Sequence, residues 1–296
     1  MFYDFETVSD HNLKKCIGYS IAMLILTREQ LKQLDEFDKN KDLDSANQLI
    51  KENQHFYFGS NIQDYLINFF KTTPPNIYYK LVSYNGRKFD NVILYDYLRN
   101  SNEVTINGVF WTGTKLTNFV IDGRHNLFDL CAHLFGSLAR NCKEFKVNVV
   151  GKTSLSHQHY QDLYDEDKLY NLSSDDIRAI RDYNILDCAS LSVIFNRYVE
   201  AIEKITSTLQ VNEKKIEIRP VYEFSTIASF AMEIVRKSWK EQEIKPKNFS
   251  EERLHQLYKD ICKYRTGGRC DNNAPIVAQD GKKYRKCHLE NTQVSS

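Results

Sequence analysis

The chain has 296 residues, of which 42% are hydrophobic and 12% aromatic, and its formal net charge is +1. These values indicate a globular protein with one large domain, or with one domain and an appended part. No apolar run approaches the roughly 18 residues of a membrane span, and the N-terminus lacks the charged and then apolar pattern of a signal peptide. We therefore expect an intracellular protein that is not secreted and has no membrane partner.

The charge is unevenly distributed along the chain. Residues 236–296 contain 14 Lys and Arg against 8 Asp and Glu, so the remainder is net acidic. A basic part beside an acidic body suits a protein that holds a polyanion with one part and metal ions with the other. A solvated Lys-rich surface explains the charge alone about as well.

Seven cysteines are scattered without a Cys-x-x-Cys pair, which indicates reduced thiols in a cytosol-like compartment. Cys262, Cys270, Cys287 and His288 are candidate zinc ligands, but their spacing fits no usual zinc ribbon or knuckle. We therefore do not predict a zinc site.

The first part of the chain reads as a strand hairpin followed by helices. Residues 1–7 form an apolar strand, and a second, buried strand covers 16–26. Residues 27–53 have apolar positions at helical spacing and predict a surface helical insertion, whose acidity we interpret as solubility. An amphipathic helix follows over 61–71.

The middle of the chain predicts the centre of a sheet. A strand over 77–84 leads to Asp90, which is placed to cap a helix over 91–99. Two or three more strands are expected within 103–128, with turns at Asn107-Gly108 and Asp122-Gly123.

The last part is predicted to be mainly helical. A helix over 131–143 and a polar loop over 151–173 precede a long helix over 174–207, opened by a cap region at Ser173–Ile177. Two further amphipathic helices are expected over 225–240 and 250–263. We divide the chain into domains 1–207 and 208–296.

Acidic residues at three places in the chain indicate a metal-binding site. If residues 1–7 form a strand, Asp4 and Glu6 share one face, where two carboxylates repel each other unless a divalent cation lies between them. Asp90 follows a central strand, and Asp187 shares a helix face with Tyr183. Four such carboxylates at one end of a sheet can hold two divalent ions and hydrolyse phosphodiesters, and the tyrosine can orient the attacking water.

At these residues the sequence resembles the exonuclease part of family B DNA polymerases. Asp4-Phe-Glu6 is similar to the first exonuclease motif, Asn85-Gly-Arg-Lys-Phe89-Asp90 to the second, and Tyr183-Asn-Ile-Leu-Asp187 to the third. Thr7 and the Phe128-Asp129 strand end resemble the protein-primed branch, which is found in linear and mitochondrial plasmids, small phages and virus-like elements.

The resemblance implies a fold and a reaction. The fold is α/β, a ribonuclease H-like (DEDD exonuclease) mixed sheet flanked by helices, with a smaller helical C-terminal part. The reaction is 3′→5′ hydrolysis of single-stranded DNA in proofreading, with two Mg²⁺ or Mn²⁺ ions held by Asp4, Glu6, Asp90 and Asp187. The expected partners are a single-stranded 3′ end, primer-template DNA and a terminal protein primer.

The resemblance also implies further contacts. Lys152 matches a lysine near the scissile phosphate, with Lys146 as a rival for the same place. The expected DNA-binding residues are Thr7, Asn85, Phe89, Tyr264, Arg265, Gly267, Gly268 and Arg269. An exposed aromatic ring stacks on a base without reading sequence, and glycines beside arginines allow close approach to phosphate.

The polymerase motifs of the family are absent from this sequence, so we expect no DNA polymerisation from this chain and interpret it as a fragment of a polymerase. Two alternatives stay open. One is a DNA-binding remnant without catalysis, and the other is a free-standing DEDD-type ribonuclease.

Overall fold

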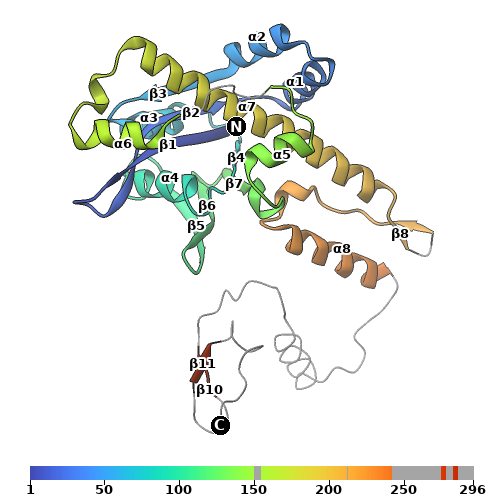
Figure 1. The fold of residues 1–296 in the computed structure, drawn as a ribbon. Coiled ribbons are helices and arrows are strands. Elements are labelled where there is room, and N and C mark those ends of the chain that lie inside the picture. The colour runs from blue at the N-terminus through green and yellow to red at the C-terminus, as the bar shows by residue number, and fades with distance from the viewer. Residues whose placement is uncertain (150–154, 212, 242–274, 278–282, 286–296) are drawn as a thin grey trace.

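The computed structural model describes residues 1–149, 155–211, 213–241, 275–277 and 283–285 (Figure 1). Within these residues, no helix combines the length and the apolar character that crossing a membrane requires.

A seven-stranded mixed sheet forms the centre of the molecule, with the strand order β3-β2-β1-β4-β7-β6-β5. β1, β4 and β7 are parallel, and each of the other strands is antiparallel to its neighbours. This α/β sheet confirms the predicted fold class, and its strand order and strand directions are compatible with a ribonuclease H-like fold. The strands are β1 (Phe2–Asp10), β2 (Lys15–Leu24), β3 (Gln54–Phe58), β4 (Lys80–Ser83), β5 (Ile106–Thr112), β6 (Lys115–Ile121) and β7 (His125–Asp129).

Helices cover both faces of the sheet. The helices are α1 (Arg28–Asn40), α2 (Leu43–Asn53), α3 (Ile62–Thr72), α4 (Asp90–Leu98), α5 (Leu138–Glu144), α6 (His157–Asp165), α7 (Ser174–Ser207) and α8 (Ile227–Glu241). The short 3₁₀ turns are η1 (Leu130–Ala132), η2 (Leu169–Asn171) and η3 (Val221–Glu223). Two small antiparallel strand pairs are formed by β8 (Gln210–Val211) with β9 (Lys214–Lys215), and by β10 (Pro275–Val277) with β11 (Lys283–Arg285).

Alternation along β1 distributes its side chains between two cores. Phe2 packs in the core with α1, α2 and α7, whereas Tyr3 and Phe5 pack in the core with α3 and α4. Because successive side chains of a strand point to opposite faces, Asp4 and Glu6 lie on the α7 side with Phe2. The sequence of β1 therefore directs both carboxylates toward the same helix.

α7 begins and ends where the sequence predicted. The Ser173 side chain accepts a hydrogen bond from the backbone N–H of Asp176 and caps the helix. The helix then packs against β1 and β2, where the Asn184 amide donates to Ser20 Oγ at 3.0 Å and the Cys188 thiol donates to the Ala22 carbonyl at 3.6 Å.

Several predicted elements differ from the structure. The prediction of a turn at Asn107-Gly108 is wrong. Gly108 lies inside β5 at a break in the pairing register, and the chain turns at Gly113 instead. The predicted helix over 131–143 is a 3₁₀ turn followed by α5, and the predicted loop over 151–173 contains α6. β3 was not predicted at all.

The helical insertion consists of α1 and α2, and its acidic side chains are not all solvated. Asp35 and Asp38 are buried, and the guanidinium of Arg197 on α7 contacts each carboxylate at 2.6 Å. The solubility interpretation is therefore wrong for these two residues, which attach the insertion to the core.

The residues after α7 pack on the same core. Val221, Phe224 and Phe230 belong to the core cluster that contains α7. His133 contacts the Tyr198 hydroxyl and the Phe224 carbonyl, both at 3.0 Å. The division into domains at residue 207 stays a prediction, and the predicted helix over 250–263 lies outside the described residues.

Candidate active site

Asp4 and Glu6 form the centre of the candidate site. Glu6 is only 5% exposed and Asp4 is partly buried on the same strand face. Burial, and then the charges of Asp90, Glu6 and Asp187, raise the pKa of Asp4 well above its usual range. Burial and the charges of Asp187 and Asp90 raise the pKa of Glu6 to about 8. Neither carboxyl ionises easily without a compensating positive charge.

Asp90 reaches this strand from the first position of α4. Its Oδ1 accepts a hydrogen bond from the backbone N–H of Phe5 at 3.1 Å, between Asp4 and Glu6 in the sequence. Burial raises the pKa of Asp90 to about 7, although the N–H of Phe5 lowers it. Asp90 therefore binds β1, and the predicted helix cap is wrong, because Asp90 is the first residue of α4 and Phe89 occupies the N-cap position.

Asp129 at the end of β7 holds the loop that carries Asp90. Its carboxylate accepts hydrogen bonds from the backbone N–H groups of Asn85 at 2.8 Å, Arg87 at 3.2 Å and Cys131 at 3.0 Å. The Arg87 guanidinium also lies 3.9 Å from this carboxylate. Asp129 belongs to the Phe128-Asp129 strand end of the resemblance, but no sequence pattern predicts its contacts with this loop.

Asp187 and Tyr183 reach the site from α7. Burial raises the pKa of Asp187 to about 6, against a hydrogen bond from Tyr183 that lowers it. Burial and the charges of Asp187, Glu6 and Asp4 raise the pKa of Tyr183, which therefore keeps its proton at neutral pH. The contacts of Asn184 and Cys188 with β2 fix this face of α7, because Ser20 and Ala22 pair with Glu6 and Asp4 in the sheet.

Asp90 and Asp187 thus both lie within electrostatic range of Asp4 and of Glu6. Within the described part of the chain, however, no three Asp, Glu, His or Cys side chains form a group positioned to hold one metal ion. An ion would have to draw the carboxylates together from these positions. Their chemistry fits Mg²⁺ or Mn²⁺, because both are hard cations that prefer carboxylate oxygens, and a bound cation would offset the burial and the repulsion that raise these pKa values.

His157 is a neighbour of the site that the sequence analysis did not select. It begins α6, its side chain is 72% exposed, and its Nδ1 lies 3.7 Å from Glu6 Oε2. The sequence placed His157 in a polar loop and offered no spacing that would join it to Glu6. Only the fold shows this contact.

The predicted DNA-contacting residues of the first two motifs are close to Asp90 and Glu6 in the sequence. Phe89 is 54% exposed directly before Asp90, and Asn85 adopts a left-handed backbone with φ of 62°. Thr7 is half-buried and follows a register break between Glu6 and Thr7.

Other predicted residues lie outside the described residues. These are Lys152, Tyr264, Arg265, Gly267, Gly268 and Arg269, together with the candidate zinc ligands Cys262, Cys270, Cys287 and His288. Lys146, the rival of Lys152, lines a cavity of about 550 Å³ together with Lys143, Tyr183 and Asp187. Two lysines therefore share a cavity with Asp187.

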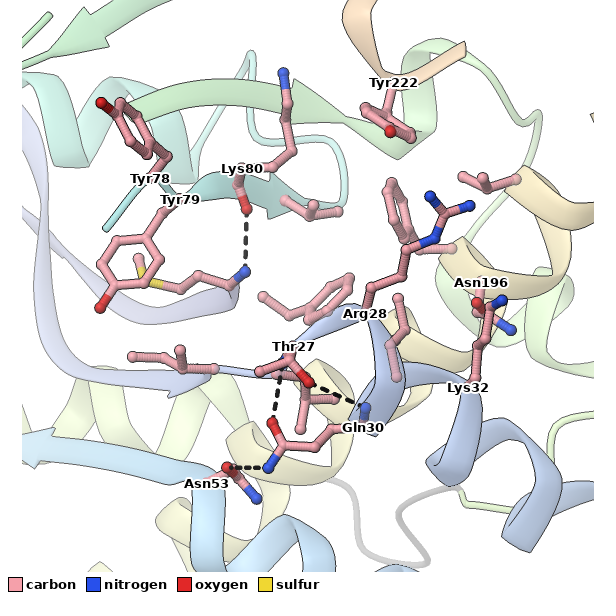
Figure 2. A pocket seen from close by; sticks show the side chains of 18 of the residues that line it. Thr27, Arg28, Gln30, Lys32, Asn53, Tyr78, Tyr79, Lys80, Asn196 and Tyr222 are labelled. Carbon is pink, nitrogen blue, oxygen red and sulfur yellow. Dashed lines mark hydrogen bonds between the residues drawn. The ribbon is translucent and has the colours of Figure 1, made fainter. Parts of the chain in front are cut away.

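A separate cavity of about 730 Å³ opens between the start of β1, α1 and α7 (Figure 2). In Figure 2, Thr27 and Gln30 cap α1 reciprocally, and Gln30 also contacts Asn53. None of the four candidate carboxylates lines this cavity. We therefore place the chemistry at the carboxylates and not here.

Comparison with known proteins gives one structural likeness. No family model matches the chain, and no curated protein matches it. Among solved structures, Phi29 DNA polymerase in an orthorhombic crystal form matches with a TM-score of 0.41 and 12% sequence identity. The match covers 70% of this chain and 34% of that polymerase, so the chain spans about a third of its length.

Proposed function

We propose that this chain is a metal-dependent 3′→5′ exonuclease that acts on single-stranded DNA. The observation that supports the proposal concerns the four acids of the three predicted motifs: besides burial, the charges of Asp90 and Asp187 raise the pKa of both Asp4 and Glu6. Buried Asp and Glu residues that serve only the fold normally have partners of opposite charge. Buried carboxyl groups that repel one another are typical of functional sites.

Asp4, Glu6, Asp90 and Asp187 would hold the divalent cations. When bound, such cations supply a nucleophile at neutral pH and stabilise the leaving oxygen in phosphodiester hydrolysis. The protein's part is to hold the carboxylates on three elements that are fixed to one another by the Phe5, Asn184 and Cys188 contacts.

The neutral side chains would orient the substrate. Tyr183 keeps its proton and donates a hydrogen bond, which suits it to position the attacking water. Phe89 offers an exposed ring on which the terminal base would stack. Asn85, four residues earlier in the same motif, would contact the strand through its amide. Stacking does not read sequence, which suits removal of any 3′ nucleotide.

The test is degradation of a 5′-labelled, single-stranded DNA oligonucleotide in Mg²⁺. We expect Asp187→Asn to lower the rate about 100-fold or more, because a carboxylate ligand is lost without a change of shape. Asp182→Asn is the matched control: Asp182 lies on the same helix but is exposed and paired with Arg181, so we expect the wild-type rate.

The proposal is wrong if wild-type protein leaves the oligonucleotide intact in Mg²⁺ and Mn²⁺, or if Asp187→Asn and Asp182→Asn degrade it equally. A matched RNA oligonucleotide in the same assay distinguishes the ribonuclease alternative, which predicts faster cleavage of RNA than of DNA. DNA binding without any cleavage selects the non-catalytic alternative.

A further inference from the structure

A groove of about 540 Å³ lies outside the carboxylate centre, between the β1–β2 hairpin, α4 and β5. We call it the α4 groove. Its lining includes Lys88, Tyr95, Arg99 and Trp111. None of these residues was assigned a role from the sequence.

The α4 groove begins at the same edge of the sheet as the candidate active site. Phe89 lines the groove and directly precedes Asp90. Ile17, also in the lining, pairs with Val8, which is two residues beyond Glu6 on β1. A strand whose end lies at the carboxylates can therefore continue into the groove.

Aromatic rings are exposed along the α4 groove. Trp111 is 41% exposed and Phe89 is 54% exposed, although large aromatic side chains usually lie in the core. Tyr95 supports Trp111 edge-on, with 6.0 Å between the ring centroids. Supported rings that stay accessible are suited to stacking against unpaired bases.

Positive charge accompanies these rings. Lys15, Lys88 and Arg99 line the α4 groove with a single acid, Asp96. Lys15 and Arg99 both pair with Asp96, at 3.8 and 2.8 Å, and Lys88 has no ion pair among the described residues. The excess of cations is complementary to a phosphate backbone.

We propose that the α4 groove binds single-stranded DNA upstream of the 3′ end that enters the carboxylate centre. Beyond the terminal base on Phe89, an upstream base stacks on Trp111, and Lys88 and Arg99 contact phosphates. This inference rests on the proposed function in one respect, the position of the 3′ end at the carboxylates. The combination of accessible rings with cations favours an unpaired nucleic acid strand over a protein partner.

The binding test uses the whole chain, a labelled oligothymidylate of about 12 nucleotides and EDTA, so that no cleavage occurs. We expect Trp111→Ala to weaken binding about tenfold through lost stacking. Lys88→Ala, an exposed change that does not threaten folding, weakens binding several-fold and lowers its salt dependence.

Two matched variants are the controls. Phe110→Ala removes a neighbouring ring on β5 that is 58% exposed but lines a different cavity. Lys32→Ala removes an exposed lysine that lines the cavity of Figure 2. We expect both variants to bind like the wild type, and circular dichroism verifies that each variant folds.

Cys16 gives a second readout, because it is exposed in the groove lining. Bound oligonucleotide should slow alkylation of the peptide that contains Cys16, measured by mass spectrometry, whereas a blunt duplex of equal length should protect it less. The proposal is overturned if Trp111→Ala and Lys88→Ala both bind the oligothymidylate with wild-type affinity and the oligonucleotide does not protect Cys16. The groove would then be assigned to a protein partner. Because cleavage is not needed, this result is independent of whether the chain is a nuclease.

Discussion

At the scale of single residues, Gly86 determines whether the loop that carries Asp90 can fold. A Cβ atom at this position would lie 2.0 Å from Ser83 Oγ and 2.5 Å from Asn91 Oδ1. Both groups are buried and already joined by a hydrogen bond of 3.0 Å, so neither can move aside easily. The Gly86 carbonyl also accepts from the N–H of Asn91, which ties the loop to the start of α4.

We therefore predict that Gly86→Ala lowers the free energy of unfolding by about 2–3 kcal/mol and impairs any activity, because the loop must shift. Urea unfolding measures the first effect. Gly113→Asn is the control, since nothing lies within 4 Å of a Cβ there and Asn tolerates the left-handed conformation. Equal losses in both variants would contradict this account of the loop.

The residue types of the site were predictable, but their contacts were not. Asp4, Glu6, Asp90 and Asp187 were found from short motifs, since spacing along one strand or helix decides which side chains share a face. The hydrogen bonds of Asp129 and the approach of His157 to Glu6 join residues that are far apart in the sequence. No local pattern encodes such contacts.

At the scale of elements, Arg197 connects α7 to the insertion of α1 and α2. Its guanidinium contacts Asp35 and Asp38 and donates to the carbonyl oxygens of Phe145 and Lys146. Asp38 in turn accepts from the backbone N–H of Val149. The network therefore fixes the segment after α5, which includes Lys146, relative to α7.

Arg197→Met should lower the free energy of unfolding by about 3 kcal/mol, because two buried carboxylates lose their shared cation. The urea midpoint measures this change. Arg178→Met on the same helix is the matched control, since its partner Asp175 is exposed and such pairs contribute less than about 1 kcal/mol. The network has no structural role if the two variants unfold at the same midpoint.

Long, capped elements were predictable and short ones were not. Ser173 and the periodicity of the following residues gave both ends of α7, because a cap and a long repeat are local signals. The Asn107-Gly108 pair looked like a hairpin turn but forms a bulge, because pairing with β6 overrides the local turn preference. Whether such a pair forms a turn or a bulge therefore depends on the strand with which it pairs.

At the scale of the whole molecule, the carboxylates make stability depend on pH and on metal. Burial raises the pKa of Glu6 to about 8 and that of Asp90 to about 7 in the folded protein, whereas the unfolded chain has ordinary values near 4. Between these values the folded state binds more protons than the unfolded state, so the free energy of unfolding falls as pH rises. Burial lowers the pKa of His125 and His133 to about 4, so these residues affect stability only below about pH 6.5. Burial also lowers the pKa of the Met1 amine to about 5, so below about pH 8 this single group offsets part of the effect of the carboxyls.

We therefore predict that the melting temperature of metal-free protein falls between about pH 6.5 and 8.5, and that Mg²⁺ raises it more at the upper end of this range. Thermal unfolding in EDTA and in Mg²⁺ measures both effects. Glu6→Gln should flatten the pH dependence, because it removes one of the titrating groups. A metal-free melting temperature that rises over this range would contradict the assignment.

The proposed activity requires the carboxylates on β1, α4 and α7 to bind divalent cations together. Calorimetric titration of Mn²⁺ into the protein at about pH 7.5 measures this binding. We predict saturable binding of two ions per chain that Asp4→Asn abolishes or weakens strongly and that Asp182→Asn leaves unchanged. Absence of binding to the wild type, or equal binding by Asp4→Asn and wild type, would contradict the claim.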